Sequence, residues 1–182
     1  MELHEDKSAR WFIYTAITFF LVTVTIGLIM AIKYVAPEFL GGIAALSFGR
    51  IRAIHTNGVL FGWLLAADMG LCFYIVPRLA GVKLFSEKLG LYTLGLWVVI
   101  ILGAVVTLGM GDTQGKEYLE LNSVLDILVT IAWVMFAVNI FATIAKRKYE
   151  NMYASLWYIM GTLLWTAIMW IVANLPVYSG VN

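Results

Sequence analysis

A histidine with two nearby arginines stands at the start of a long apolar segment, and these residues carry the clearest chemistry in the sequence. The histidine is His55, and the arginines are Arg50 and Arg52. An imidazole nitrogen can bind a metal ion or a heme iron, and a guanidinium can hold a carboxylate through two hydrogen bonds. Arg52 and His55 are three residues apart, so in a helix they share one face about 5 Å apart along the axis. They can therefore address the iron and a propionate of the same macrocycle.

The same residues also have a simpler interpretation. A histidine near the end of a membrane helix is commonly a hydrogen-bonded interfacial side chain, and arginines at a membrane boundary commonly extend to water. The residue types alone leave both interpretations open. The only other histidine, His4, belongs to the polar N-terminal segment.

Composition predicts a membrane protein. The chain is 62% hydrophobic and 13% charged, whereas soluble domains are about 25% charged. Five apolar segments are each about 20 residues or longer, enough to cross a bilayer. They are residues 11–34, 52–76, 89–108, 123–145 and 153–174. We therefore expect an all-α integral membrane fold with five transmembrane helices, forming a single membrane domain over residues 1–182.

Charge asymmetry predicts the orientation of the helices. Positively charged residues concentrate on the cytoplasmic side of membrane proteins. Eight of the 12 Lys and Arg residues fall on the side of the N-terminus, and the other four fall on the side of His55. We expect a cytoplasmic N-terminus, a C-terminus on the outer side and His55 near the outer face of the membrane. The net charge of +1 gives no reason to expect a nucleic-acid partner.

The second apolar segment contains two further features. Gly58, Gly62 and Gly70 recur on one helix face, together with Ala66. Such a face permits close approach of another helix or of a porphyrin edge. Asp68 lies about 20 Å along the helix from His55,. A carboxyl group at membrane depth is costly, so Asp68 is either a proton-relay or quinol-site carboxylate or a protonated acid hydrogen-bonded to a neighbouring helix. Pro77 is expected to end this helix.

Three sequence blocks carry a resemblance to a known family. They are residues 47–57, which read SFGRIRAIHTN; residues 116–121, KEYLEL, with Asp126–Ile127–Leu128; and residues 133–137 with residues 145–148. The chain resembles the N-terminal part of the catalytic subunit of cbb3-type cytochrome c oxidases, a branch of the heme–copper oxidases. The resemblance extends over essentially the whole chain, and the first block is its most specific part.

The resemblance implies roles for particular residues. His55 matches an axial ligand of the low-spin heme b, and Arg52 matches an arginine near the heme propionates. Glu117, with Tyr118 beside it, matches a glutamate that helps to bind Ca²⁺ between propionates. A carboxylate beside propionates is repulsive without a cation, so this assignment is physically reasonable. The alternative for Glu117 is a solvated carboxylate that the dipole of the following helix favours.

The chain departs from the family pattern in one large respect. The family subunit has about twelve transmembrane helices, and its second axial histidine, its oxygen-reducing heme, its copper ligands and its active-site tyrosine belong to later helices. No histidine follows His55 here, so this chain supplies no copper ligands and is not catalytically complete alone. The resemblance implies a membrane partner chain that supplies the later helices and the second axial histidine, and also c-type cytochrome subunits.

The sequence thus predicts a heme-b-binding component of an oxidoreductase complex, a cbb3-like terminal oxidase or a related reductase. It carries electrons toward an active site on another chain. Two alternatives remain at this point. One is a membrane subunit for structure or assembly that has no cofactor, and the other is part of a nitric oxide reductase relative.

Overall fold

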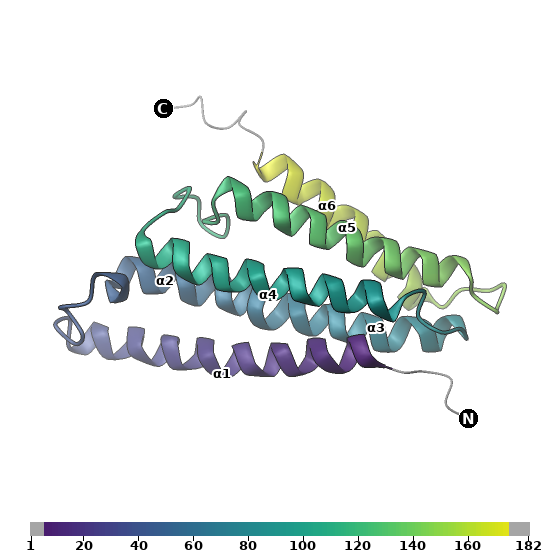
Figure 1. The fold of residues 1–182 in the computed structure, drawn as a ribbon, viewed down its shortest axis with the longest axis horizontal. Helices are drawn as coiled ribbons and strands as arrows, with labels where there is room; N and C mark the ends of the chain where they lie inside the picture. The colour runs from purple at the N-terminus through teal and green to yellow at the C-terminus, as the bar shows by residue number, and fades with distance from the viewer. Residues whose placement is uncertain (1–5, 175–182) are drawn as a thin grey trace.

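Five helices long and apolar enough to cross a membrane make up most of residues 6–174, the part of the chain that the computed structural model describes (Figure 1). Their bounds are Lys7–Val35 (α1), Phe48–Ala80, Glu87–Met110 (α4), Ser123–Ala145 (α5) and Ala154–Asn174 (α6). These residues contain no β-strand beyond one isolated bridge between Lys116 and Leu119. The predicted all-α fold with five transmembrane helices is confirmed, and the chain is a multi-pass membrane protein. His4 lies outside the described residues.

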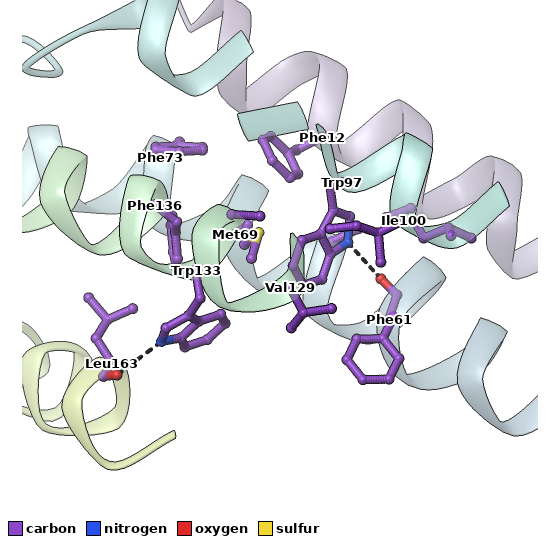
Figure 2. Close-up of a cluster of buried hydrophobic side chains, with 14 of the residues drawn as sticks. Phe12, Phe61, Met69, Phe73, Trp97, Ile100, Val129, Trp133, Phe136 and Leu163 are labelled. Atoms are coloured by element: carbon purple, nitrogen blue, oxygen red, sulfur yellow. Dashed lines mark hydrogen bonds between the residues drawn. The ribbon is translucent and has the colours of Figure 1, made fainter. Parts of the chain in front are cut away.

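The second of these helices is continuous but has three parts. It starts with α2 (Phe48–Asn57), continues through a π-helical stretch, η2 (Gly58–Leu65), and ends with α3 (Ala66–Ala80). A π-helical stretch changes which amides the backbone carbonyls meet, and it often occurs at functional sites. Here the carbonyl of Phe61 accepts a hydrogen bond of 2.9 Å from the indole nitrogen of Trp97 on α4 (Figure 2). The irregular stretch is therefore anchored to the neighbouring helix.

The prediction that Pro77 ends the second helix is wrong. The helix continues to Ala80 and ends at Gly81, which adopts φ +68. Amides of Gly81 and Val82 then bond the carbonyls of Arg78 and Pro77, a common helix ending that requires a left-handed residue,. Pro77 removes only one backbone hydrogen bond, and the buried packing of its own side chain holds the last turn in place.

Aromatic side chains form the core between the helices. Trp97, Phe12 and Phe73 are almost completely buried, and the ring centroids of Phe73 and Phe136 are 5.2 Å apart. Figure 2 shows Trp133 of α5 donating its indole N–H to the carbonyl of Leu163 on α6, over 3.0 Å. Helices α1 and α6 lie at opposite edges of the bundle and leave much of their apolar surface exposed (Figure 1). Lipid or a membrane partner must cover these faces.

Helix α1 covers the small-residue face of the second helix. A Cβ atom on Gly58 would lie 2.5 Å from Cγ2 of Thr23, and one on Gly62 would lie 3.0 Å from Phe19. Side chains of Ile13 and Phe12 approach Gly70 equally closely. Helix packing, one of the two interpretations of this face, is thus what the structure shows. Helix α1 occupies the space beside Gly58 and Gly62, and a cofactor-binding role of these two glycines or a partner contact on this face remains a prediction.

Candidate functional site

His55 is held in one orientation by helix α1. Its Nδ1 lies 2.9 Å from the backbone carbonyl of Thr23, which can only accept a hydrogen bond, so Nδ1 carries the proton,. The other ring nitrogen, Nε2, then has a free lone pair and makes no hydrogen bond to the described residues. Metal-binding histidines are commonly oriented in this way, with one nitrogen bonded to a carbonyl and the other on the metal. The geometry therefore makes Nε2 of His55 available as a ligand.

A glycine of α1 provides the space for the imidazole ring. A Cβ atom on Gly27 would lie 2.8 Å from Cε1 and 3.3 Å from Nδ1 of His55. Carbon atoms do not approach so closely, so any larger residue would displace the ring. Gly27 and Thr23 are one turn apart on α1, and together they set the position of His55. Neither residue was expected from the sequence to contribute to the site.

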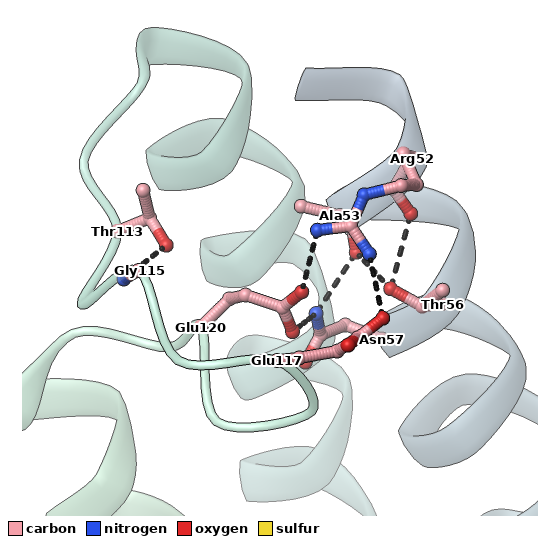
Figure 3. A network of polar contacts seen from close by, with 8 residues as sticks. All are labelled: Arg52, Ala53, Thr56, Asn57, Thr113, Gly115, Glu117 and Glu120. Atoms are coloured by element: carbon pink, nitrogen blue, oxygen red, sulfur yellow. Dashed lines mark hydrogen bonds and ion pairs between the residues drawn. The ribbon is translucent and has the colours of Figure 1, made fainter. Parts of the chain in front are cut away.

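Arg52 lies between two glutamates of the loop that joins α4 and α5. Its Nη1 is 3.2 Å from Oε1 of Glu117, and its Nη2 is 3.5 Å from Oε1 of Glu120. Figure 3 shows both contacts, with the amide nitrogen of Asn57 donating to Oε2 of Glu120 over 2.8 Å. The Glu117 side chain is 66% exposed, whereas that of Glu120 is only 4% exposed. The structure thus brings Arg52 and Glu117 together as the sequence suggested, and it adds Glu120 and Asn57.

The loop that carries the two glutamates is folded back onto the bundle. Leu121 is fully buried, and the side-chain amide of Gln114 donates to the carbonyl of Leu121 over 2.6 Å and also to the carboxylate of Asp126. The backbone amide of Gln114 bonds the carbonyl of Glu120. Gly115, with φ +72, makes the turn between these contacts. The loop therefore holds the Glu120 carboxylate beside Arg52 instead of leaving it in solvent.

Arg50 and Tyr118 are less directly engaged in the site than their neighbours. Nη1 of Arg50 donates to the carbonyl of Gly109 over 3.0 Å, so it satisfies a carbonyl in the last turn of α4,. Tyr118 is 58% exposed and sits in the loop with φ +64. Arg50 thus stabilises the end of a neighbouring helix, and the cofactor-binding roles of Arg50 and Tyr118 remain predictions.

The site carries an excess of acid and has buried oxygen atoms without hydrogen-bond partners. One guanidinium faces two carboxylates, and Oε1 of Glu120 and Oδ1 of Asn57 are buried without hydrogen bonds. Oxygen atoms of carboxylates and side-chain amides are the ligands that Ca²⁺ prefers. Residues 6–174 contain no group of three or more His, Cys, Asp or Glu residues that could hold a metal by themselves. The oxygen set fits a cation that other ligands complete.

A small cavity lies between the second helix and α4, on a different side of the helix from the imidazole of His55. It is lined by Ile54, Asn57, Gly58 and Phe61 with parts of α4, and its volume is about 10 Å³. A space of this size holds one water molecule. The ring of His55 instead lies against α1, beside Gly27 and Thr23.

Asp68 is remote from His55 and belongs to a different part of the surface. It is exposed on α3, where it lines a cavity of about 330 Å³ between α3, α5 and α6. The structure does not bring Asp68 together with His55, Arg52 or Glu117. A direct role of Asp68 at the histidine site is therefore not supported, and its function as a proton or quinol site remains a prediction.

The chain is similar in sequence to known proteins of one family. Residues 7–181 match the family model described as Cytochrome C and Quinol oxidase polypeptide I. The chain belongs to this family, subunit I of the heme–copper oxidases. It is 36% identical to the cbb3-type cytochrome c oxidase subunit CcoN1 of Stutzerimonas stutzeri, over 94% of this chain and 36% of that protein. It is 38% identical to cytochrome c oxidase subunit 1 of Rhodobacter capsulatus, over 87% of this chain and 30% of that protein. The resemblance inferred from the sequence blocks is thereby confirmed.

A member of another branch is also similar. The chain is 30% identical to a nitric oxide reductase subunit of Stutzerimonas stutzeri, over 81% of this chain and 34% of that protein. The chain thus spans about a third of the length of the curated relatives that it matches. Membership of the subunit I family implies heme cofactors in general and a complex with other subunits, and the particular cofactor and partners of this chain are a matter of proposal.

Four residues of the site were missed by sequence reasoning: Glu120, Asn57, Gly27 and Thr23. Glu120 lies within the second sequence block, but its spacing from Glu117 does not indicate which of the two carboxylates is buried. Asn57 is two residues after His55 and reads as part of the same polar block. Gly27 belongs to an apolar segment with no special pattern. Only Glu120 could have been found from the sequence, because a carboxylate in the loop on the same side of the membrane as Arg52 can form an ion pair with it.

Proposed function

We propose that this chain is a heme-b-binding membrane subunit of a cbb3-like terminal oxidase or a related reductase, in which it carries electrons toward an active site on another chain. The observation that supports this function is the orientation of His55. Its Nδ1 bonds the Thr23 carbonyl, and its Nε2 is left with a free lone pair. A low-spin heme b bound there would supply a one-electron redox centre.

The remaining residues of the site would hold the periphery of the cofactor. The guanidinium of Arg52 already binds two carboxylates, Glu117 and Glu120, and propionates carry the same chemical group,. The oxygen atoms of Glu117, Glu120 and Asn57 would bind a divalent cation, Ca²⁺ by preference, because they are hard ligands and carry excess negative charge. Such a cation would reduce the repulsion between these glutamates and a propionate.

We infer that this function also uses membrane helices beyond those of residues 1–182, and we assign them to a membrane partner chain. Low-spin iron with two imidazoles needs a second histidine, and no histidine follows His55. We infer that the partner supplies the second axial histidine and the later helices, and that c-type cytochrome subunits complete the complex. In this arrangement His55 faces the periplasm of a bacterial inner membrane, with the N-terminus in the cytoplasm.

A second candidate function is that of a component of a nitric oxide reductase. The observation in its favour is the 30% identity to the nitric oxide reductase subunit of Stutzerimonas stutzeri over 81% of the chain. Both candidates use the same residues of this chain in the same roles. They differ in the active site that the partner contributes, so turnover of oxygen against nitric oxide by the purified complex distinguishes them.

A spectrum of the purified complex tests the proposal. We expect a b-type band in the reduced-minus-oxidised spectrum, and we expect His55→Ala to abolish the low-spin signal while the chain still inserts into the membrane. Thr56→Ala is a matched control, because Thr56 is adjacent and bonds only backbone carbonyls of its own helix. The chain expressed without its partner should bind heme weakly or not at all. A full low-spin signal in His55→Ala would reject the ligand assignment, and the absence of any heme band in the complex would leave a structural or assembly role.

A further inference from the structure

Helix α3 and the end of η2 present a row of exposed side chains that no other described helix covers. The row is Leu64, Asp68, Leu71 and Ile75, at successive intervals of four, three and four residues. The three apolar members are 43%, 47% and 38% exposed. We name this row the Asp68 seam. Intervals of four and three residues are the pattern by which one helix packs along another at a small crossing angle.

The polar member of the seam lies at membrane depth. Asp68 is 12 residues from the end of its helix at Ala80, which corresponds to about 18 Å along the axis,. Among residues 6–174 it makes neither a hydrogen bond nor an ion pair. A carboxyl group in contact with hydrocarbon costs at least a few kcal/mol, so such groups face a partner or water. The seam therefore contains a polar group that needs a partner from outside this chain.

The surroundings of Asp68 form a groove and not a flat lipid-facing surface. The cavity of about 330 Å³ is bordered by α3 on one side and by Tyr158, Thr162 and Thr166 of α6 on the other. Helix α6 packs loosely here, because only Leu156 and Leu163 of its described residues are buried. A void of this volume loses dispersion contacts along its whole lining. Side chains of one further helix would fill it and would cover the seam at the same time.

We propose that a transmembrane helix of the membrane partner chain occupies the groove between α3 and α6 and donates a hydrogen bond from a polar side chain to Asp68. A single polar residue in an otherwise apolar seam specifies register and partner, as a buried Asn does in coiled coils. A lipid chain offers no donor, and a second copy of this chain would place one carboxyl group against another. The inference rests on the proposed function only in taking the partner that completes the complex as the source of this helix.

Photocrosslinking from the seam is the first part of the test. Benzoylphenylalanine is placed at Leu71 of the chain in the native membrane complex, with Val99 as the matched control. Val99 is exposed on α4 and does not line the groove. We expect Leu71 to crosslink to a transmembrane peptide of the partner that carries a hydrogen-bond donor within one turn of the crosslink, and Val99 to crosslink to lipid.

Substitution of Asp68 is the second part. Asp68→Asn keeps an acceptor oxygen, whereas Asp68→Leu removes it and is itself well tolerated at membrane depth. A polar contact between membrane helices corresponds to about 3- to 20-fold in the association constant. We therefore expect Asp68→Leu to lower co-purification of the partner by about that factor, and Asp68→Asn to restore most of it.

Several results would overturn the inference. They are crosslinks from Leu71 to lipid alone, crosslinks to a second copy of this chain, crosslinks to a helix without a donor near that level, and unchanged co-purification of the partner in Asp68→Leu. Loss of the Leu71 crosslink when a lipid-soluble small molecule is added would also overturn the inference. The outcome is separate from that of the heme proposal, because the crosslink does not depend on His55. A complex without heme that still crosslinks from Leu71 would contradict the proposed function and leave the helix contact standing.

Discussion

The close contact between Gly27 and His55 can be used to test whether helix α1 orients the imidazole, as distinct from general helix packing. In Gly27→Ala the new methyl group would lie 2.8 Å from Cε1 of His55. The ring must rotate away or α1 must move, and either change disrupts the hydrogen bond from Nδ1 to the Thr23 carbonyl. The substitution therefore tests whether that hydrogen bond orients the ligand.

The magnitude follows from the two contributions. Loss of a neutral hydrogen bond costs about 0.5–1.5 kcal/mol, and overpacking adds about 1–3 kcal/mol when the surroundings cannot relax. The total is roughly 0.5–4.5 kcal/mol, and the lower end applies if the ring rotates freely. Gly95→Ala is the matched control, because Gly95 is also helical and has open space where its Cβ would be. Both variants gain the same helix propensity, so their difference reports the clash.

Two measurements on the purified complex decide the outcome. The first is the denaturation midpoint of each variant in detergent, which should be lower in Gly27→Ala than in Gly95→Ala. The second is the low-spin heme spectrum, which should lose intensity or shift in Gly27→Ala and stay at the wild-type value in Gly95→Ala. If both variants match the wild type in both measurements, the reasoning that α1 positions His55 is refuted.

Two further predictions concern the acidic side of the site. In Arg52→Gln the heme should remain bound but its midpoint potential should fall, because removal of a nearby positive charge disfavours the added electron; a redox titration with an unchanged or raised midpoint would count against this role. In Glu117→Gln and Glu120→Gln bound calcium should decrease, with the larger loss in Glu120→Gln because that carboxylate is buried beside Asn57. Metal analysis measures it, and equal calcium in all three proteins, or none in the wild type, would leave the glutamates as partners of Arg52 only.

The number of membrane helices could be predicted because it depends on local properties. Each segment is long and apolar enough to cross a bilayer, and this needs no knowledge of its neighbours. The expected range 123–145 coincides with α5, while the first and second helices extend several residues beyond the expected ranges. Helix ends depend on caps and packing more than on hydropathy. Pro77 is an example. A proline normally ends a helix, but the second helix continues to Ala80, because the residues of its last turn are packed in the interior.

The partner of the small-residue face could not be predicted. Spacing showed that Gly58, Gly62 and Gly70 share a side, and that something approaches it closely. Whether that neighbour is a helix of the same chain, a partner or a cofactor depends on how five helices are arranged in space. In the structure, the neighbour of this face is helix α1. The same limit applies to Glu117 and Glu120, since their different burial comes from the fold of the loop and the anchoring of Leu121.

The charges at the site connect the heme proposal with the calcium proposal. Arg52 supplies one positive charge, while Glu117 and Glu120 supply two negative charges, so the protein groups alone are already acidic. A propionate next to Arg52 would add further negative charge in a place where Glu120 is shielded from water, and like charges repel strongly there. Arg52 cannot compensate for all of them. A divalent cation on the oxygen atoms of Glu117, Glu120 and Asn57 would restore the balance, so chelation of calcium should lower the heme potential in the same direction as Arg52→Gln. If the cation were absent, the repulsion would instead push the heme propionates away from Arg52, and its substitution would leave the potential unchanged.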